Sequence, residues 1–217
     1  MNYGFMPLRA DESEPKLSIQ DEINRFSIQL YHHLASTVDL KERRVLEIGS
    51  GRGGGAHYLK RYFSPRNMVG IDFSKQAVSL CRQHYNVDGL SFIPGDAEAL
   101  PFNDNSFDAV VNVESSHCYA SMDAFLNQVK RVLKPGGHFL FTDFRNKENL
   151  SEMSNQLEQT GFHSLRFRDI SENVIKALEA DDYRVNLIEK AAPSILKKLM
   201  REFAGVKGTT FYKRLSG

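Results

Sequence analysis

Residues 44–54 of the chain read RVLEIGSGRGG, a short apolar strand pattern that runs directly into glycines. The glycines at 49, 51 and 54 have the spacing G-x-G-x-x-G, which permits a tight turn and a close approach of the backbone to a bound nucleotide. Residues 53–63 have a helical pattern, so the stretch predicts a strand, a glycine loop and a helix. The spacing alone is a weak signal, because a glycine-rich turn that binds nothing also satisfies it.

Outward from this loop, apolar segments typical of strands alternate with helical segments. The predicted strands are residues 44–48, 67–72, 90–95, 107–113, 138–143, 162–168 and 209–215. The predicted helices among them are residues 53–63, 75–86, 125–133 and 147–160, and Ser74 is the candidate cap of the second. Such alternation requires right-handed crossovers and a parallel sheet. We therefore predict an α/β fold with a doubly wound, mostly parallel seven-stranded sheet of Rossmann-like type.

The composition is that of an ordinary globular protein. The chain has 217 residues, and 28 Lys and Arg nearly balance 27 Asp and Glu, so no charge excess indicates a nucleic-acid partner. Two cysteines are too few for a disulfide scaffold. Residues 1–16 lack a secretory signal pattern, and no apolar run approaches the ~18 residues that would span a bilayer. We expect a cytoplasmic protein without stable membrane insertion.

Acidic residues follow the predicted strands at positions that suit a nucleoside. Asp72 lies 21 residues after Gly51, where a carboxylate accepts hydrogen bonds from ribose hydroxyls. The plain alternative for Asp72 is a residue beside the N-terminus of the next helix. Asp96 follows the third predicted strand and is a candidate acceptor for an adenine amino group, with a solvated turn acid as the plain alternative. Both NAD(P) and S-adenosylmethionine fit this order. Glu47, two residues before Gly49, favours S-adenosylmethionine, because its charge repels pyrophosphate and tolerates an ammonium and a sulfonium.

Five segments in register resemble the ordered motifs of class I S-adenosylmethionine-dependent methyltransferases. They are VLEIGSGRGGG at 45–55, GID at 70–72, GDAEALPF at 95–102, FDAVVNVE at 107–114 and RVLKPGG at 131–137. Within that superfamily, MNYGF at 1–5 and NVESSHCY at 112–119 look like the phthiotriolone/phenolphthiotriolone dimycocerosates methyltransferases, which methylate a hydroxyl on a long lipid. Sugar O-methyltransferases and sterol and tocopherol C-methyltransferases are more distantly similar.

The resemblance implies S-adenosylmethionine as cofactor and a set of candidate residues that bind it. These are Tyr3, Glu47, Gly49, Ser50, Gly51, Asp72, Phe73, Asp96, Ala97, Asn112 and Glu114. Phe73 is a candidate platform for the adenine ring, with a core aromatic as the alternative. By resemblance, the N-terminal arm folds over the donor and brings Tyr3 near its methionine end.

His117 is the candidate general base. It follows the fourth predicted strand at the carboxyl edge of the sheet, where doubly wound sheets bind ligands. Asp143 ends the fifth strand at the same edge, and neighbouring strands lie ~4.8 Å apart, so Asp143 is placed to orient His117 and stabilise its protonated form. Likeness to the sugar O-methyltransferases implies the same pair. A structural histidine and a turn-capping aspartate are the alternatives.

Together these features predict an enzyme that transfers a methyl group from S-adenosylmethionine to a hydroxyl of a small or lipidic acceptor, phenols included, with His117 as base. A C-methyltransferase, a non-catalytic S-adenosylmethionine-binding module and an NAD(P)-dependent oxidoreductase stay open as alternatives. Residues 1–40 are predicted as an arm and helix over the cofactor site, and 41–217 as the methyltransferase domain. Its helical insertion, 172–204, is a candidate lid. The histidines and cysteines show no metal-ligand spacing, and a homodimer is one open oligomeric state.

Overall fold

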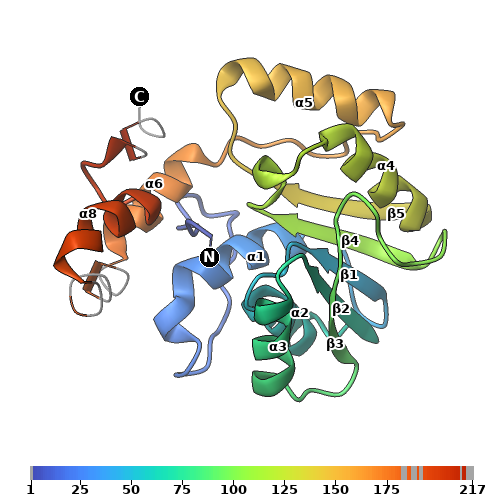
Figure 1. Ribbon diagram of the computed structural model, residues 1–217, viewed down its shortest axis with the longest axis horizontal. Coiled ribbons are helices and arrows are strands. Elements are labelled where there is room, and N and C mark those ends of the chain that lie inside the picture. Colours follow the sequence, from blue (N-terminus) through green and yellow to red (C-terminus); the bar gives the residue numbers. More distant parts are fainter. Residues whose placement is uncertain (1, 182–184, 187–189, 191–192, 211, 214–217) are drawn as a thin grey trace. The chain divides into compact units, whose positions relative to one another are not determined.

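The computed structural model describes residues 2–181, 185–186, 190, 193–210 and 212–213 (Figure 1). The chain forms two compact units, one made of Met1–His33 with Arg166–Gly217 and the other of Leu34–Leu165. The predicted division at residue 40, and the position of the arm over a cofactor site, stay predictions.

The second unit is built on a parallel sheet of five strands. They are β1 (Arg44–Ile48), β2 (Asn67–Asp72), β3 (Leu90–Pro94), β4 (Phe107–Val113) and β5 (Leu133–Thr142). Their order is β3-β2-β1-β4-β5, and every neighbouring pair is parallel. The strand order therefore reverses between β1 and β4, and the carboxyl ends of these two strands form the point where doubly wound sheets bind their ligands.

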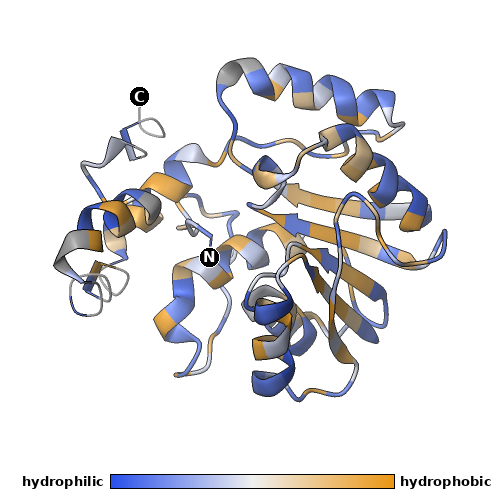
Figure 2. Ribbon diagram, in the orientation of Figure 1, coloured by the Kyte–Doolittle hydropathy of each residue, from blue (hydrophilic) through white to orange (hydrophobic). Residues whose placement is uncertain are grey.

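Helices cover both faces of this sheet, α4 and α5 on one face and α2 and α3 on the other (Figure 1). Their bounds are α2 Gly54–Phe63, α3 Lys75–His84, α4 Met122–Val132 and α5 Lys147–Gln159. Alternate residues of β1, Leu46 and Ile48, pack in one core cluster with Phe125 and Val129 of α4. The apolar stripe of α4 has helical spacing because it covers this strand face, and the strands accordingly appear hydrophobic in Figure 2.

Two of the seven predicted strands are wrong. The predicted strand 162–168 does not form, because Gly161 and Phe162 end α5. The Gly161 amide bonds to the Glu158 carbonyl at 2.9 Å, and the Phe162 amide bonds to the Leu157 carbonyl at 3.0 Å. This pairing is the Schellman arrangement, which requires the left-handed φ of +82° found at Gly161. The backbone at the start of the predicted strand is therefore used by the helix end.

The predicted strand 209–215 is a helical turn in its described part. The amide of Lys213 bonds to the carbonyl of Thr209 at 3.0 Å, and the amide of Tyr212 bonds to the Thr209 hydroxyl at 3.3 Å. A threonine side chain that bonds to the nearby backbone favours such a turn over a strand, whatever the β-propensity of its neighbours. Residues 214–215 lie outside the described residues.

The first unit joins segments that are far apart in the sequence. The helices of its described residues include η1 (Glu22–Asn24), α1 (Arg25–Ala35, whose last two residues belong to the second unit), α6 (Ser171–Ala180) and α8 (Ser194–Phe203). The buried carboxylate of Glu12 pairs with Arg168 and accepts a hydrogen bond from Asn173 of α6 at 3.0 Å. Two backbone amides of the arm also bond to Glu12, so one carboxylate ties the arm to α6.

Candidate active site

The glycine loop follows β1, and three of its glycines have left-handed backbones. Gly49, Gly51 and Gly53 have φ of +74°, +53° and +77°. A Cβ at Gly49 would lie 2.3 Å from Ser115 Oγ, and one at Gly53 would lie 2.8 Å from Cys81 Sγ. These positions require glycine for space as well as for φ.

The third glycine of the predicted spacing is therefore not the one that the loop needs. Gly54 has no left-handed φ, and a Cβ there would meet no heavy atom within 4 Å. The sequence pattern GRGGG offers three consecutive glycines, and only packing of α3 and β3 against the loop distinguishes Gly53 from its neighbours.

Asp72 lies at the carboxyl end of β2 and holds the loop in place. Its Oδ2 accepts a hydrogen bond from the Gly51 amide at 2.7 Å, and its Oδ1 accepts one from the Ser74 amide at 2.9 Å. Ser74 in turn caps α3, as predicted, by accepting from Ala77 at 3.2 Å. Each carboxylate oxygen has a further lone pair, so these bonds leave Asp72 able to accept from a ligand.

Two further candidate residues for binding a nucleoside, Phe73 and Asp96, lie on the surface. Phe73 directly follows Asp72 and is 81% exposed, which excludes the alternative of a core aromatic. Asp96 is exposed, and its Oδ1 accepts from the Glu98 amide at 2.9 Å, while Ala97 packs against the core. A flat apolar ring beside an acid at the end of β2 is suited to stacking on a planar base.

Three other candidates lie within or beside the sheet. Asn112 is fully buried, and its Nδ2 donates to the Ile48 carbonyl at 2.9 Å, so it joins β4 to the end of β1. Glu47 is buried in β1. Glu114 has a left-handed φ of +46°, and its amide bonds to the Thr142 carbonyl at 2.8 Å. Tyr3 belongs to the other unit, where it packs near Val174 and Tyr212, so its role toward the donor stays a prediction.

The loop lies in a negative environment. Burial, together with the charges of Glu47 and Asp72, raises the pKa of Cys81 to about 11, and the Cys81 thiol lies 3.4 Å from the Gly51 carbonyl. Cys81 is therefore a neutral thiol against the loop. Two carboxylates at this position disfavour a pyrophosphate and favour a cationic ligand.

His117 and Asp143 are in direct contact at the carboxyl edge of the sheet. His117 belongs to the short helix η2 (Ser116–Cys118), which follows β4, and Asp143 follows β5. The His117 Nδ1 lies 2.8 Å from Asp143 Oδ1, and the His117 amide donates to Oδ2 at 3.0 Å. The Asp143 side chain is fully buried, whereas that of His117 is 28% exposed.

Three further groups hold Asp143. Ser116 Oγ donates to its Oδ2 at 2.6 Å, the Phe144 amide donates to its Oδ1 at 2.8 Å, and Arg145 lies 3.1 Å from Oδ2. Burial raises the pKa of Asp143, but the hydrogen bonds from His117 and Ser116 and the charge of Arg145 outweigh it, so that the pKa is lowered overall. Asp143 is therefore ionised at neutral pH and can only accept hydrogen bonds.

The ionised Asp143 determines the tautomer of His117. Because the carboxylate only accepts, Nδ1 of neutral His117 carries the proton, and Nε2 has the free lone pair of a base. The imidazole also lies on the Phe144 ring, with centroids 4.2 Å apart at 37°. Two contacts thus orient a partly exposed imidazole at the edge of the sheet.

Comparison with known proteins decides the family. Residues 46–141 match the family described as methyltransferase domain. A fatty-acid O-methyltransferase of Mycolicibacterium smegmatis is 41% identical over 208 residues, which cover 94% of this chain and 74% of that protein. A phthiotriol/phenolphthiotriol dimycocerosates methyltransferase of Mycobacterium tuberculosis is 39% identical over 213 residues, 96% of this chain and 79% of that protein. The chain belongs to the S-adenosylmethionine-dependent methyltransferases.

Solved structures bear out the fold of this methyltransferase. A geranyl diphosphate C-methyltransferase of Streptomyces coelicolor aligns with a TM-score of 0.67 at 15% identity, covering 94% of this chain and 86% of that one. The [4+2]-cyclase SpnF aligns with a TM-score of 0.65 at 21% identity, covering 91% and 78%. The predicted Rossmann-like fold and family are confirmed, with five strands instead of seven. Since the fold also occurs in a cyclase, fold alone does not select the reaction.

The methyltransferase takes S-adenosylmethionine as cofactor, and the loop fits it. A Cβ at Gly51 would meet no heavy atom within 4 Å, so the backbone there is open to a close approach. Ser50 Oγ is buried and has no hydrogen-bond partner among the described residues. With the negative environment of Glu47 and Asp72, these features suit a ligand that bears an ammonium and a sulfonium. The NAD(P)-dependent oxidoreductase is thereby set aside.

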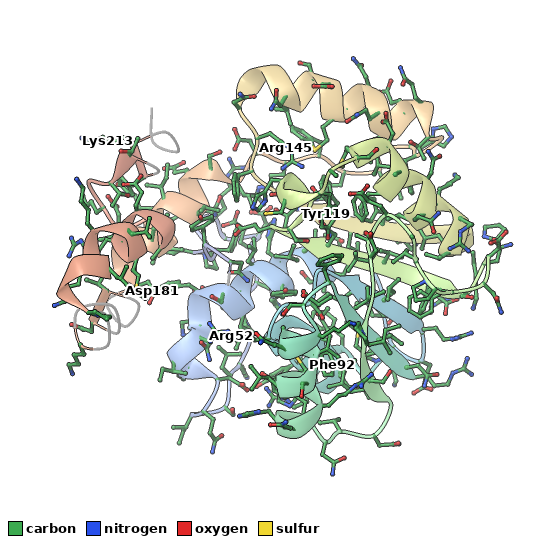
Figure 3. All side chains as sticks on the ribbon, in the orientation of Figure 1. Arg52, Phe92, Tyr119, Arg145, Asp181 and Lys213 are labelled. Carbon is green, nitrogen blue, oxygen red and sulfur yellow. The ribbon has the colours of Figure 1, made fainter. Side chains whose placement is uncertain are left out.

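Sequence reasoning missed Ser116 and Arg145. Arg145 Nη2 donates to Ser116 Oγ at 2.7 Å, so the two residues close a ring of contacts around Asp143. Figure 3 labels Arg145. Ser116 precedes His117 in the sequence, and Arg145 follows Asp143 by two residues, so this proximity could have indicated a role at the site. No spacing rule, however, distinguishes the two from ordinary loop residues.

Tyr119, also labelled in Figure 3, lies beside the loop, since a Cβ at Gly49 would lie 2.9 Å from its hydroxyl. Its hydroxyl lies 2.9 Å from Ser115 Oγ and accepts from Asn112 Nδ2 at 3.1 Å, and burial raises its pKa to about 12. We expect Tyr119→Phe to lower the free energy of unfolding by about 1 kcal/mol, the value of one hydrogen bond. Urea unfolding measures this.

The matched control is Tyr85→Phe, because the hydroxyl of Tyr85 makes no hydrogen bond with the described residues. It should leave the free energy of unfolding within the usual error. Equal effects of the two substitutions would show that the Tyr119 hydroxyl does not stabilise this part of the structure.

Proposed function

We propose that this methyltransferase transfers the methyl group of S-adenosylmethionine to a hydroxyl oxygen of a lipidic acceptor, with His117 as general base. The observation that carries the proposal is the 2.8 Å contact between His117 and the buried Asp143, which leaves Nε2 available at the ligand-binding edge of the sheet. The predicted cytoplasmic location, homodimer and lid over the acceptor stay predictions.

The donor supplies an activated methyl group, and the residues of this chain supply position and a proton acceptor. In the transfer, the acceptor oxygen forms a bond to the methyl carbon as the carbon–sulfur bond breaks, and the hydroxyl proton passes to His117 Nε2. Asp143 stabilises the resulting imidazolium, as carboxylates do for other histidine bases. Alignment of the reactants can contribute ~7–11 kcal/mol of barrier lowering.

The names of the relatives support a lipid as acceptor. One is a fatty-acid O-methyltransferase and the other a phthiotriol/phenolphthiotriol dimycocerosates methyltransferase, and both cover most of this chain. The first name also supports a second candidate, transfer to a carboxylate oxygen of a fatty acid. The two candidates differ in one respect, because a carboxyl with a pKa near ~4.3 is already ionised at neutral pH and needs no base.

A panel of acceptors tests the proposal. The purified chain is incubated with S-adenosylmethionine and, separately, a long-chain alcohol, a long-chain phenol, a fatty acid and a sterol. S-adenosylhomocysteine release and the mass of the product are then measured. We expect O-methylated alcohol or phenol.

Each other outcome has a distinct meaning. Methyl ester alone would replace the hydroxyl proposal with the carboxylate candidate, and a product methylated on carbon would support the C-methyltransferase alternative. Binding of S-adenosylhomocysteine without turnover of any acceptor class would contradict both oxygen proposals.

A further inference from the structure

Helix α8 carries an exposed apolar stripe. Leu196, Leu199 and Met200 are 44%, 66% and 40% exposed. Their spacing of three and four residues places them on one face of the helix. Exposed large apolar side chains that gather in this way mark a surface that contacts an apolar partner.

The same helix is basic. Lys197, Lys198 and Arg201 lie within Ser194–Phe203, and this helix holds one acidic residue, Glu202. Hydrophobic and hydrophilic residues accordingly lie side by side around α8 in Figure 2. A helix with leucines on one face and lysines beside them is the pattern of helices that lie in the interface of a lipid bilayer.

A second exposed apolar pair in the same unit has acidic neighbours instead. Ile19 and Ile23 are 91% and 48% exposed, but their neighbours Asp21 and Glu22 are acidic. A negative surface repels acidic flanks and attracts basic ones. Charge therefore distinguishes the two patches even though both expose aliphatic side chains.

We propose that α8 lies on the surface of an anionic lipid bilayer, with its apolar stripe among the acyl chains and its basic residues at the phosphate headgroups. Its ten residues span about 15 Å, half the thickness of the hydrocarbon core, so the helix lies in the surface and does not cross it. Within the described ranges, every helix is too short or too polar to cross a bilayer.

This docking is independent of the reaction at His117. It deepens the proposed function in one respect, because an enzyme with a lipidic acceptor gains from being held at the surface where such lipids reside. Vesicle binding is measured without any methyl acceptor, so failure of the docking proposal and failure of the proposed function are distinguishable.

Flotation with vesicles tests the proposal. We expect the chain to float with vesicles of phosphatidylcholine and phosphatidylglycerol in equal parts, and to float little with phosphatidylcholine alone. Raising the salt from about 0.1 M to about 1 M shortens the Debye length from ~10 Å to ~3 Å and should release the protein.

Variants separate the two contributions. The triple change Leu196→Gln, Leu199→Gln and Met200→Gln should weaken binding to the mixed vesicles at least about tenfold, since it removes the apolar anchor. The double change Lys197→Gln and Lys198→Gln should weaken it about tenfold and reduce its salt dependence. Ile19→Gln, which removes an exposed aliphatic side chain with acidic neighbours, is the matched control and should bind as the unaltered chain does.

Far-ultraviolet circular dichroism reports that each variant is folded, and affinity for S-adenosylhomocysteine should be unchanged. Several results would overturn the proposal: no flotation with mixed vesicles, equal flotation with both compositions, or unaltered flotation of the triple variant. If the chain forms a dimer that the triple variant loses, and vesicles bind neither protein, then a second copy of the chain covers α8 instead.

Discussion

His117→Ala should lower turnover of a hydroxyl acceptor by ~10²–10⁴-fold at neutral pH, the usual contribution of a general base. Affinity for S-adenosylhomocysteine should barely change, because the proton acceptor faces the methyl acceptor. Raising the pH should partly restore the rate with a phenol, whose pKa near ~10 lets it ionise unaided. The measurement is initial rate against pH for the unaltered chain and the variant.

Two controls accompany this experiment. His84→Ala removes an exposed histidine of α3, whose Nδ1 lies 3.0 Å from the Leu80 carbonyl, and should leave turnover unchanged. A fatty acid as acceptor should be insensitive to His117→Ala, because a carboxylate has no proton to lose. Unaltered rates of His117→Ala with a hydroxyl acceptor at every pH would show that His117 is structural and that positioning alone carries the reaction.

Asp143→Asn should reduce turnover less than His117→Ala, because the imidazole remains although it is poorly oriented.

The contribution of Asp143 to stability has a defined pH range. Its folded pKa is lowered, so this contribution is present above the ordinary carboxyl pKa and is lost as the pH falls through the lowered value. Changes in rate above neutral pH therefore do not report the titration of Asp143.

Asp72→Ala should weaken binding of S-adenosylmethionine by about 10- to 150-fold, corresponding to ~1.5–3 kcal/mol for a hydrogen bond to a charged group. The structure adds a second reason, since the substitution also releases the Gly51 amide that Asp72 holds at 2.7 Å. Calorimetric titration with S-adenosylhomocysteine measures the loss. Thermal unfolding of the same sample shows whether the variant is folded.

Ser74→Ala is the matched control for Asp72. It removes the side-chain cap of α3, which accepts from Ala77 at 3.2 Å, and leaves the Asp72 carboxylate in place. We expect it to lower stability by about 1 kcal/mol with little change in donor affinity. Unchanged affinity in a folded Asp72→Ala variant would contradict a role of Asp72 in binding the donor.

The sequence alone predicted the elements whose signals are local. The strand of residues 44–48, the glycine loop and the Ser74 cap follow from patterns within a few residues. The contact of His117 with Asp143 was also predictable, because the carboxyl ends of adjacent parallel strands meet at one edge. The strand count was not, because Phe162 and Thr209 lie in short-range turns that β-propensity does not reveal.

Only the tertiary structure decided which side chains complete the site. Gly53 is required because Cys81 and Phe92, from two later elements, occupy the space that its Cβ would fill. Ser116 and Arg145 meet at Asp143 across 29 residues of sequence, and their pairing depends on the register of β4 against β5. A single sequence records residue types and local spacing, whereas register and packing decide which distant side chains share one carboxylate.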